Sequence, residues 1–287
     1  MAEPGALKYQ ATVDLGQRNN SHTLLHELAV GERQAPLSIL EVGCASGYLG
    51  ASLVARGHRV TGVEPDPASA HAAARVLTDV WNGGLHDYLA THPQARFDVL
   101  LFGDVLEHMV DPADALRHAL PHLREGGRIV VGLPNVAHGS VRAMLLEGRF
   151  DYEERGILDR THLRFFTREG IAKLCADTGL AIERLYAVGV PIGDVDREYH
   201  MRLRREYVTA IELLDADESR HAFQYVLRAA PSPLPPSALL DANLRVEVER
   251  TAPIPHPHGV RSWKQRLQVK LFHALLRSIS ERRHRGQ

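Results

Sequence analysis

The sequence predicts an α/β fold: a doubly wound, Rossmann-like sheet of seven strands, with helices on both faces and the last strand pair antiparallel. Three observations point to this class. An apolar, β-prone run at 39–42 turns into a helix through glycines. A further apolar run ends at Glu64, and another covers 97–102 with the unbroken pattern of strands buried on both faces. Helical spacing fills the stretches between them.

The glycine turn has the pattern Glu41-x-Gly43-x-x-x-Gly47. Glycines between a strand and a helix let the backbone approach a ligand closely, and the first amide groups of the helix point toward that ligand. The spacing matches neither the dinucleotide-binding motif nor the phosphate loop of nucleotide triphosphatases. Glu64 ends the next strand about twenty residues further on, where a carboxylate can accept both hydroxyls of a ribose. The turn therefore predicts a nucleoside pocket.

The other elements follow from caps, breakers and periodicity. We expect helices at 22–29, 68–77, 113–123, 168–177 and 194–214, and strands near 80–82 and at 128–133, 180–190 and 221–229. Asn20 and Ser21 cap the first helix, and Gly126 and Gly127 end the third. The segment 141–166 mixes aromatic, acidic and arginine residues, so we expect it to be more mobile than the core and to carry specificity.

Composition limits the compartment and the partners. The formal net charge of the 287 residues is -1, but ten Arg or Lys stand against four Asp or Glu from Pro231 onward, so the body before it is acidic. This argues against nucleic acid as a partner. Cys44 and Cys175 lie far apart without metal spacing, which predicts a reduced, cytoplasmic setting. We expect a chain that is neither exported nor membrane-spanning, because no apolar stretch is long enough.

Proline density divides the chain into three predicted parts. Residues 1–230 form the α/β domain, 231–260 a proline-rich linker, and 261–287 a basic amphipathic helix. The helix allows three interpretations. It could bind an anionic membrane surface at the inner face, contact a partner protein or a second copy in a homodimer, or dock on its own domain.

Several phrases of the sequence resemble one known family. The glycine turn and Glu64 are followed by FDVLLFGDVLEH at 97–108, LPNVAHGS at 133–140 and LDRTHLRFFT at 158–167. In this order they resemble class I S-adenosylmethionine-dependent methyltransferases. The resemblance covers roughly residues 10–190 and narrows to a bacterial branch similar to methionine-biosynthesis-type and ubiquinone-type enzymes, often associated with glycan assembly.

The resemblance implies S-adenosylmethionine as the cofactor and a set of residues that bind it. They are Glu41, Gly43, Ala45, Gly47, Tyr48, Glu64, Pro65, Gly103 and Asp104. One position departs from the family, because Gly84 stands where relatives commonly carry an Asp for the adenine amino group. The adenine contact then comes from a backbone amide or from Asp87, or it is missing. This departure keeps open a regulatory subunit that binds the cofactor without catalysis.

A hydroxyl acceptor needs a base, and the unperturbed pKa of histidine suits that role near neutrality. Loops at the carboxyl end of the sheet carry three candidates, His162, His138 and His108. His162 is the first choice because Asp159 precedes it as an orienting carboxylate. For each histidine the alternative is a purely structural role. The predicted substrate-binding residues are Asn135, Arg160 and Arg164, with the arginines suited to an anionic acceptor.

Metal chemistry is not predicted. His118 and His122 are four residues apart on one helix, but Pro121 intervenes and no third ligand is evident. The predicted function is therefore methyl transfer from S-adenosylmethionine to a hydroxyl of a sugar or glycan intermediate. The alternative is O- or N-methylation of a small soluble metabolite.

Overall fold

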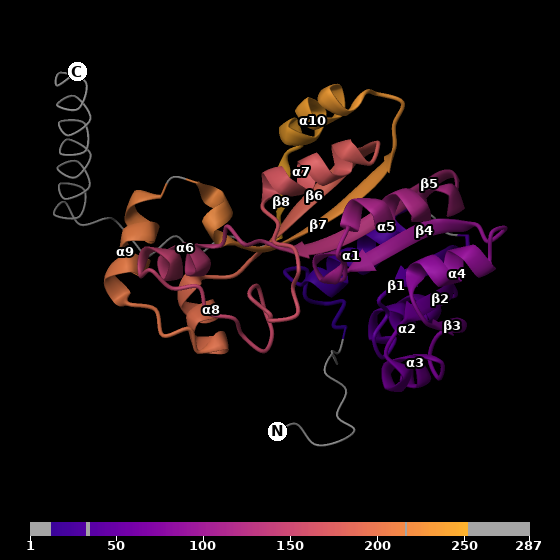
Figure 1. Ribbon diagram of the computed structural model, residues 1–287, viewed down its shortest axis with the longest axis horizontal. Helices are drawn as coiled ribbons and strands as arrows, with labels where there is room; N and C mark the ends of the chain where they lie inside the picture. Colours follow the sequence, from indigo (N-terminus) through magenta and orange to yellow (C-terminus); the bar gives the residue numbers. More distant parts are fainter. Residues whose placement is uncertain (1–12, 33–34, 216, 252–287) are drawn as a thin grey trace. The chain divides into compact units, whose positions relative to one another are not determined.

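The structure, a computed structural model, describes residues 13–32, 35–215 and 217–251 (Figure 1). These residues form two compact units. The first contains residues 13–137, 151–189 and 222–251, and the second contains 138–150 and 190–221. The predicted terminal helix at 261–287 and most of the predicted linker's second half lie outside the described residues. None of the helices described is long and apolar enough to cross a membrane.

The first unit is built on one sheet, and its described strands follow the order β3-β2-β1-β4-β5-β7-β6-β8. The strands are β1 (Ser38–Val42), β2 (Arg59–Glu64), β3 (Asp79–Asn82), β4 (Phe97–Gly103), β5 (Leu123–Pro134), β6 (Leu180–Gly189), β7 (Ala222–Pro231) and β8 (Val248–Arg250). The first five are parallel, and β7 runs antiparallel to both β5 and β6. The predicted doubly wound fold with a closing antiparallel pair is confirmed.

Helices cover both faces of this sheet (Figure 1). One face packs on α1 (Ser21–Val30), α2 (Tyr48–Val54) and α3 (Pro67–Ala73). The other packs on α4 (Leu85–Thr91), α5 (Pro112–Ala119) and α7 (Arg168–Asp177). The central strands β1 and β4 are buried on both sides, so most of their side chains are apolar. Their carboxyl ends are the edge at which ligands bind in such sheets.

The third predicted helix and the fifth strand have different bounds from those expected. Helix α5 ends at Ala119, and a 3₁₀ turn over Leu120–His122 follows, because Pro121 cannot continue an α-helix. Strand β5 then begins at Leu123, so Gly126 and Gly127 do not end a helix. They lie where the register between β4 and β5 shifts, as glycines in bulged strands do.

The predicted linker at 231–260 is wrong over its described part. Residues Pro236–Arg245 form α10, and β8 adds an eighth strand that pairs in parallel with β6. Buried Asn243 holds this segment: its Oδ1 accepts from Ile182 N at 2.8 Å, and its Nδ2 donates to Leu180 O at 3.0 Å. Pro236 occupies the first position of the helix, where proline is tolerated, so the proline cluster starts an element instead of a linker.

The second unit contains α6 (Gly139–Leu146), α8 (Ile192–Tyr199), α9 (Arg205–Leu214) and a 3₁₀ turn over Glu218–His221. Ala143, Ile192 and Ile211 form its apolar centre. The single helix predicted at 194–214 is wrong, because His200 and Arg202 have positive φ values of 53° and 55° and separate α8 from α9.

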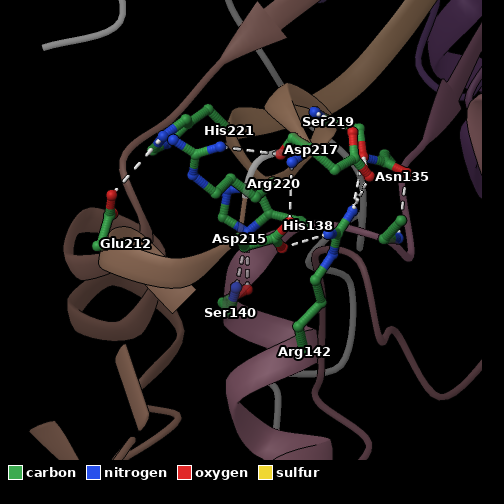
Figure 2. A network of polar contacts seen from close by, with 11 residues as sticks. Asn135, His138, Ser140, Arg142, Glu212, Asp215, Asp217, Ser219, Arg220 and His221 are labelled. Atoms are coloured by element: carbon green, nitrogen blue, oxygen red, sulfur yellow. Dashed lines mark hydrogen bonds and ion pairs between the residues drawn. The ribbon is translucent and has the colours of Figure 1, made fainter. Parts of the chain in front are cut away.

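Arg142 of α6 ties the two segments of the second unit together (Figure 2). Its guanidinium bonds the carboxylate of Asp215, lies 2.7 Å from Asp217 Oδ2 and donates to Ser219 Oγ at 2.6 Å. A planar guanidinium can hold several oxygens at once, so one side chain fixes the whole loop that follows α9.

Candidate functional site

The glycine turn between β1 and α2 is locked to the neighbouring strand. Gly43 N donates to Val63 O at 2.8 Å, and Gly43 and Gly47 have φ values of 70° and 80°. A Cβ at Gly43 would lie 2.5 Å from a methyl carbon of Val105, and one at Gly47 would lie 3.1 Å from Ala73 Cα. Both positions therefore need glycine for conformation and for space.

Glu64 closes the turn from the end of β2. Its Oε2 accepts from Ala45 N at 2.9 Å, and its Oε1 accepts from Asp66 N at 2.9 Å. Ala45 itself has a positive φ of 48°, a strained conformation for a residue with a Cβ. Each carboxylate oxygen has two acceptor positions, so Glu64 can hold the turn and still accept from two ribose hydroxyls. The residues present fit the nucleoside part of S-adenosylmethionine, and exposed Pro65 follows directly.

A second carboxylate follows Gly103 at the end of β4. Asp104 has a positive φ of 53°, and its backbone N donates to Gly132 O at 3.2 Å. Its Oδ1 accepts from Gln224 Nε2 at 2.5 Å, while burial raises the pKa of Asp104 to about 6. Sequence reasoning missed Gln224 because it comes from β7, 120 residues further along the chain. No pattern in the sequence links the two residues.

Glu41 and Tyr48 occupy different parts of the turn. Glu41 is 4% exposed, and burial raises its pKa to about 8. A Cβ at Gly50 would lie 2.3 Å from Glu41 Oε2, so this carboxyl lies beneath α2 and supports the turn from below. Tyr48 begins α2, and its ring meets the edge of His22 with centroids 5.1 Å apart. The direct cofactor contacts expected for both residues stay predictions.

Three ionisable side chains gather beyond β4. Glu107 and His108 lie on a 3₁₀ turn, Leu106–His108, and His162 comes from the segment before α7. The rings of His108 and His162 meet edge to face with centroids 4.8 Å apart, and His162 Nε2 lies 4.0 Å from Glu107 Oε1. Burial, and then the charge of Asp104, hold the pKa of Glu107 well above its usual value.

The hydrogen bonds of the two histidines determine which ring nitrogen carries a proton. His162 Nδ1 lies 3.0 Å from Ile157 O, and His108 Nδ1 lies 3.2 Å from Thr161 O. A carbonyl oxygen only accepts, so Nδ1 is the donor in both rings and Nε2 carries the lone pair of the neutral form. His162 is 9% exposed, whereas His108 is half-buried. The more accessible base is His108.

Asp159, the carboxylate predicted to orient His162, is connected to His108 through Thr161. Asp159 Oδ1 accepts from Thr161 Oγ1 at 2.7 Å, and Thr161 Oγ1 lies 3.2 Å from His108 Nδ1. The chain of contacts therefore runs from Asp159 through Thr161 to His108. The Glu107 carboxyl lies near His162, with Oε1 4.0 Å from His162 Nε2. These contacts favour Asp159 as a carboxylate that orients His108, and its predicted role toward His162 stays a prediction.

The predicted substrate-binding residues have structural partners. Asn135 is fully buried and donates to Ala222 O at 2.8 Å, which favours a structural role over a substrate contact. Arg164 Nε and Nη2 both bond Val110 O, at 3.0 and 2.5 Å, and fasten the segment to the loop after β4. Arg160 is exposed and lies 2.7 Å from Glu154 Oε1. Of the three, Asn135 is buried, whereas Arg160 and Arg164 are exposed.

His138 belongs to the second unit and caps α6 (Figure 2). Its Nε2 lies 2.9 Å from Val190 O and must donate, so Nδ1 accepts from Ser140, whose backbone N is 3.2 Å away. Both ring nitrogens are bonded and the residue is 0% exposed. Burial also lowers the pKa of His138 to about 4. These contacts correct the prediction of a catalytic base here and give His138 a structural role.

Two groups among the described residues bring together side chains able to ligate a metal ion. Glu107, His108 and His162 offer one ligand atom each, all within 4.8 Å of one another, and so do exposed His86, Asp114 and His118. The helical pair considered from the sequence does not form a site, because His122 is buried with Nδ1 3.0 Å from Ala95 O.

Comparison with known proteins agrees with the fold and the turn. A family model described as a methyltransferase domain matches residues 16–185. The match covers more than half of the chain, so the chain belongs to this family. The family resemblance predicted from the motifs is confirmed.

Individual relatives are similar over part of their length. Ubiquinone biosynthesis O-methyltransferases from Bradyrhizobium diazoefficiens and Aeromonas salmonicida are 31% and 25% identical over 166 and 155 residues, or 55% and 52% of this chain. The chain covers 64% and 65% of the length of these two relatives. A crystal structure of magnesium protoporphyrin IX methyltransferase from Synechocystis PCC 6803 superposes with a TM-score of 0.52 at 14% identity, covering 78% of this chain and 90% of that one. This likeness concerns the fold alone.

Proposed function

We propose that the protein transfers a methyl group from S-adenosylmethionine to a hydroxyl oxygen of a small-molecule acceptor. The observation that carries the proposal is the position of His108. This half-buried histidine lies on the 3₁₀ turn that follows β4, near Asp104, and is oriented through Thr161 and Asp159. The names of the two relatives, both O-methyltransferases of ubiquinone biosynthesis, support oxygen as the methylated atom.

The residues of the turn would hold the cofactor. Glu64 would accept from the ribose hydroxyls, and the glycines at 43 and 47 would let the backbone approach the nucleoside. S-adenosylmethionine supplies an electrophilic methyl group on a positively charged sulfur. The remaining work of the chain is to hold the acceptor oxygen in line with that group and to keep water away.

His108 would remove the proton of the acceptor. A hydroxyl is a poor nucleophile until a base takes its proton, and in neutral His108 the lone pair lies on Nε2 because Nδ1 donates to Thr161. The imidazolium that forms is stabilised through the hydroxyl of Thr161, which in turn bonds the Asp159 carboxylate.

We propose that the acceptor is a sugar or glycan intermediate, methylated on a hydroxyl. The alternative acceptor is a small soluble metabolite. A screen with labelled cofactor tests both, using sugar, glycan-precursor, phenolic and amine acceptors in parallel. Label in a hydroxyl-bearing acceptor supports the proposal. Label in amines alone would overturn oxygen methylation, and cofactor binding without turnover on any acceptor would favour the regulatory subunit.

A further inference from the structure

The first unit contains a cavity that lies away from the cofactor turn. Its volume is about 580 Å³, which is within the usual range of small-molecule sites, roughly 300–1,000 Å³. Four arginines line it, Arg56, Arg128, Arg184 and Arg228, against two glutamates, Glu27 and Glu32. The lining therefore contains more arginine than glutamate side chains.

The strand register places this cavity at the other end of the sheet from the cofactor turn. Arg128 pairs with Val99 near the start of β4, whereas Gly132 pairs with Gly103 at its end, beside Asp104. Four residues of strand separate the two levels by roughly 13 Å. On the neighbouring antiparallel strands, Arg184 lies opposite Arg228, so the two side chains share one face of the sheet.

Two of the arginines converge on one point. A Cβ built on Gly31, at the end of α1, would lie 2.3 Å from Arg128 Nη1 and 3.6 Å from Arg228 Nη1. Two guanidinium groups this close repel each other, and an anion between them offsets the repulsion. Arg56 adds a third cation, exposed and without an acidic partner among the described residues.

The glutamates near the cavity are engaged by arginines. Glu27 Oε2 lies 3.4 Å from Arg18 Nη2, and Glu183 Oε2 lies 2.7 Å from Arg228 Nε. Glu249 Oε1 lies 2.6 Å from Arg184 Nε. Arg184 and Arg228 each use one edge of the guanidinium for these pairs, and a guanidinium has five N–H donors. Donors remain for a ligand.

A buried polar group in the wall also lacks a partner. His26 lines the cavity, is 3% exposed, and its Nε2 has no hydrogen-bond partner. The other ring nitrogen lies 2.8 Å from Ser52 Oγ, which donates its own proton to Leu49 O. Nδ1 is therefore the donor and Nε2 an unsatisfied acceptor, which native proteins rarely leave buried. A hydroxyl of a ligand can supply the missing donor.

We infer that this arginine cavity binds a small, soluble phosphorylated molecule that also carries hydroxyl groups, at a site separate from the cofactor turn. Guanidinium groups match phosphate oxygens in pairs, which makes a phosphate or pyrophosphate group the best occupant for the point between Arg128 and Arg228. This inference goes beyond the proposed function and does not depend on the acceptor.

Calorimetric titration of the full chain with inorganic phosphate and pyrophosphate tests the site. Gly31→Ala introduces a Cβ that pushes Arg128 aside, and Arg56→Ala removes an exposed cation without disturbing the core. We expect pyrophosphate to bind the natural chain and both variants to lose at least tenfold in affinity. Gly179→Ala is the matched control, because Gly179 also follows a helix with φ of 73° and its Cβ would meet nothing within 4 Å.

Three results of these titrations would overturn the proposed site. Equal pyrophosphate affinity in the natural chain and in Arg56→Ala would overturn the site, as would absence of binding at millimolar concentration. Equal loss in Gly31→Ala and Gly179→Ala would assign the loss in Gly31→Ala to backbone strain and would also contradict the site. Affinity for S-adenosylhomocysteine, measured in parallel, reports the integrity of the cofactor site.

Discussion

The orientation of the His108 ring depends on its contacts in the folded chain, which involve Thr161 and Asp159. The sequence brings Asp159 within three residues of His162, and that proximity predicts that the two form a pair. In the folded chain Thr161 Oγ1 lies between Asp159 and His108, a residue 51 positions earlier than Asp159. The histidine-rich sequence allows three candidates, and only tertiary contacts show that His108 is less buried than His162 and His138.

Replacing His108 by Ala should lower kcat by about 10²- to 10⁴-fold, the usual contribution of a general base. Affinity for S-adenosylhomocysteine should stay unchanged, because Glu64 and the glycine turn are untouched. Single-turnover assays with labelled cofactor measure the first quantity and calorimetry the second. His71→Ala, an exposed histidine on α3, is the control. A His108→Ala enzyme with full turnover would remove the base from this account.

At the scale of elements, apolar periodicity and glycine spacing identified the strands and the cofactor turn, because both follow from local rules. These local rules did not predict elements whose formation depends on contacts between residues far apart in the sequence. Asn243 recruits α10 and β8 to the sheet through bonds to Leu180 and Ile182, about sixty residues away in sequence. The break between α8 and α9 depends on positive φ values at His200 and Arg202, which neither residue type signals.

The cap of α6 gives a pH-dependent contribution to stability. The pKa of His138 falls from 6.5 to about 4 on folding, so above pH 6.5 the neutral ring contributes its full stabilisation to the folded state. As the pH falls from 6.5 to 4, only the unfolded chain takes up the proton, and the folded state loses up to about 3 kcal/mol. In His138→Asn the side chain can still cap α6 but does not take up a proton in this pH range.

Urea unfolding at pH 7 and pH 4.5 measures this effect. The difference in free energy of unfolding between the natural chain and His138→Asn should shrink toward the lower pH, since all other titrating groups cancel. A difference that is the same at both pH values would contradict a buried, neutral His138.

At the scale of the whole molecule, the second unit is made from two segments, 138–150 and 190–221, that are separated in the sequence. The sequence predicted one domain, because chain connectivity alone does not show which segments pack together. Arg142 holds the unit through Asp215, Asp217 and Ser219 (Figure 2).

Arg142→Ala should lower the free energy of opening the second unit by about 1–3 kcal/mol, the cost of leaving the partly buried carboxylate of Asp215 without its partner. Hydrogen exchange followed by mass spectrometry should show faster exchange in α6 and α9, while the first unit keeps its protection. Arg197→Ala, an exposed arginine of α8 that pairs with Asp194 at 3.2 Å, should change exchange little. Equal protection in both variants would assign the network no role in holding the unit.

The most direct test concerns the carboxylate at the end of β2. Calorimetry with S-adenosylhomocysteine on the natural chain, on Glu64→Ala and on the exposed control Glu125→Ala compares the three affinities. Loss of most of the affinity in Glu64→Ala alone is the expected result, because its two oxygens hold Ala45 and Asp66 and are placed to accept the ribose hydroxyls. Equal affinity in all three proteins would mean that the nucleoside binds elsewhere.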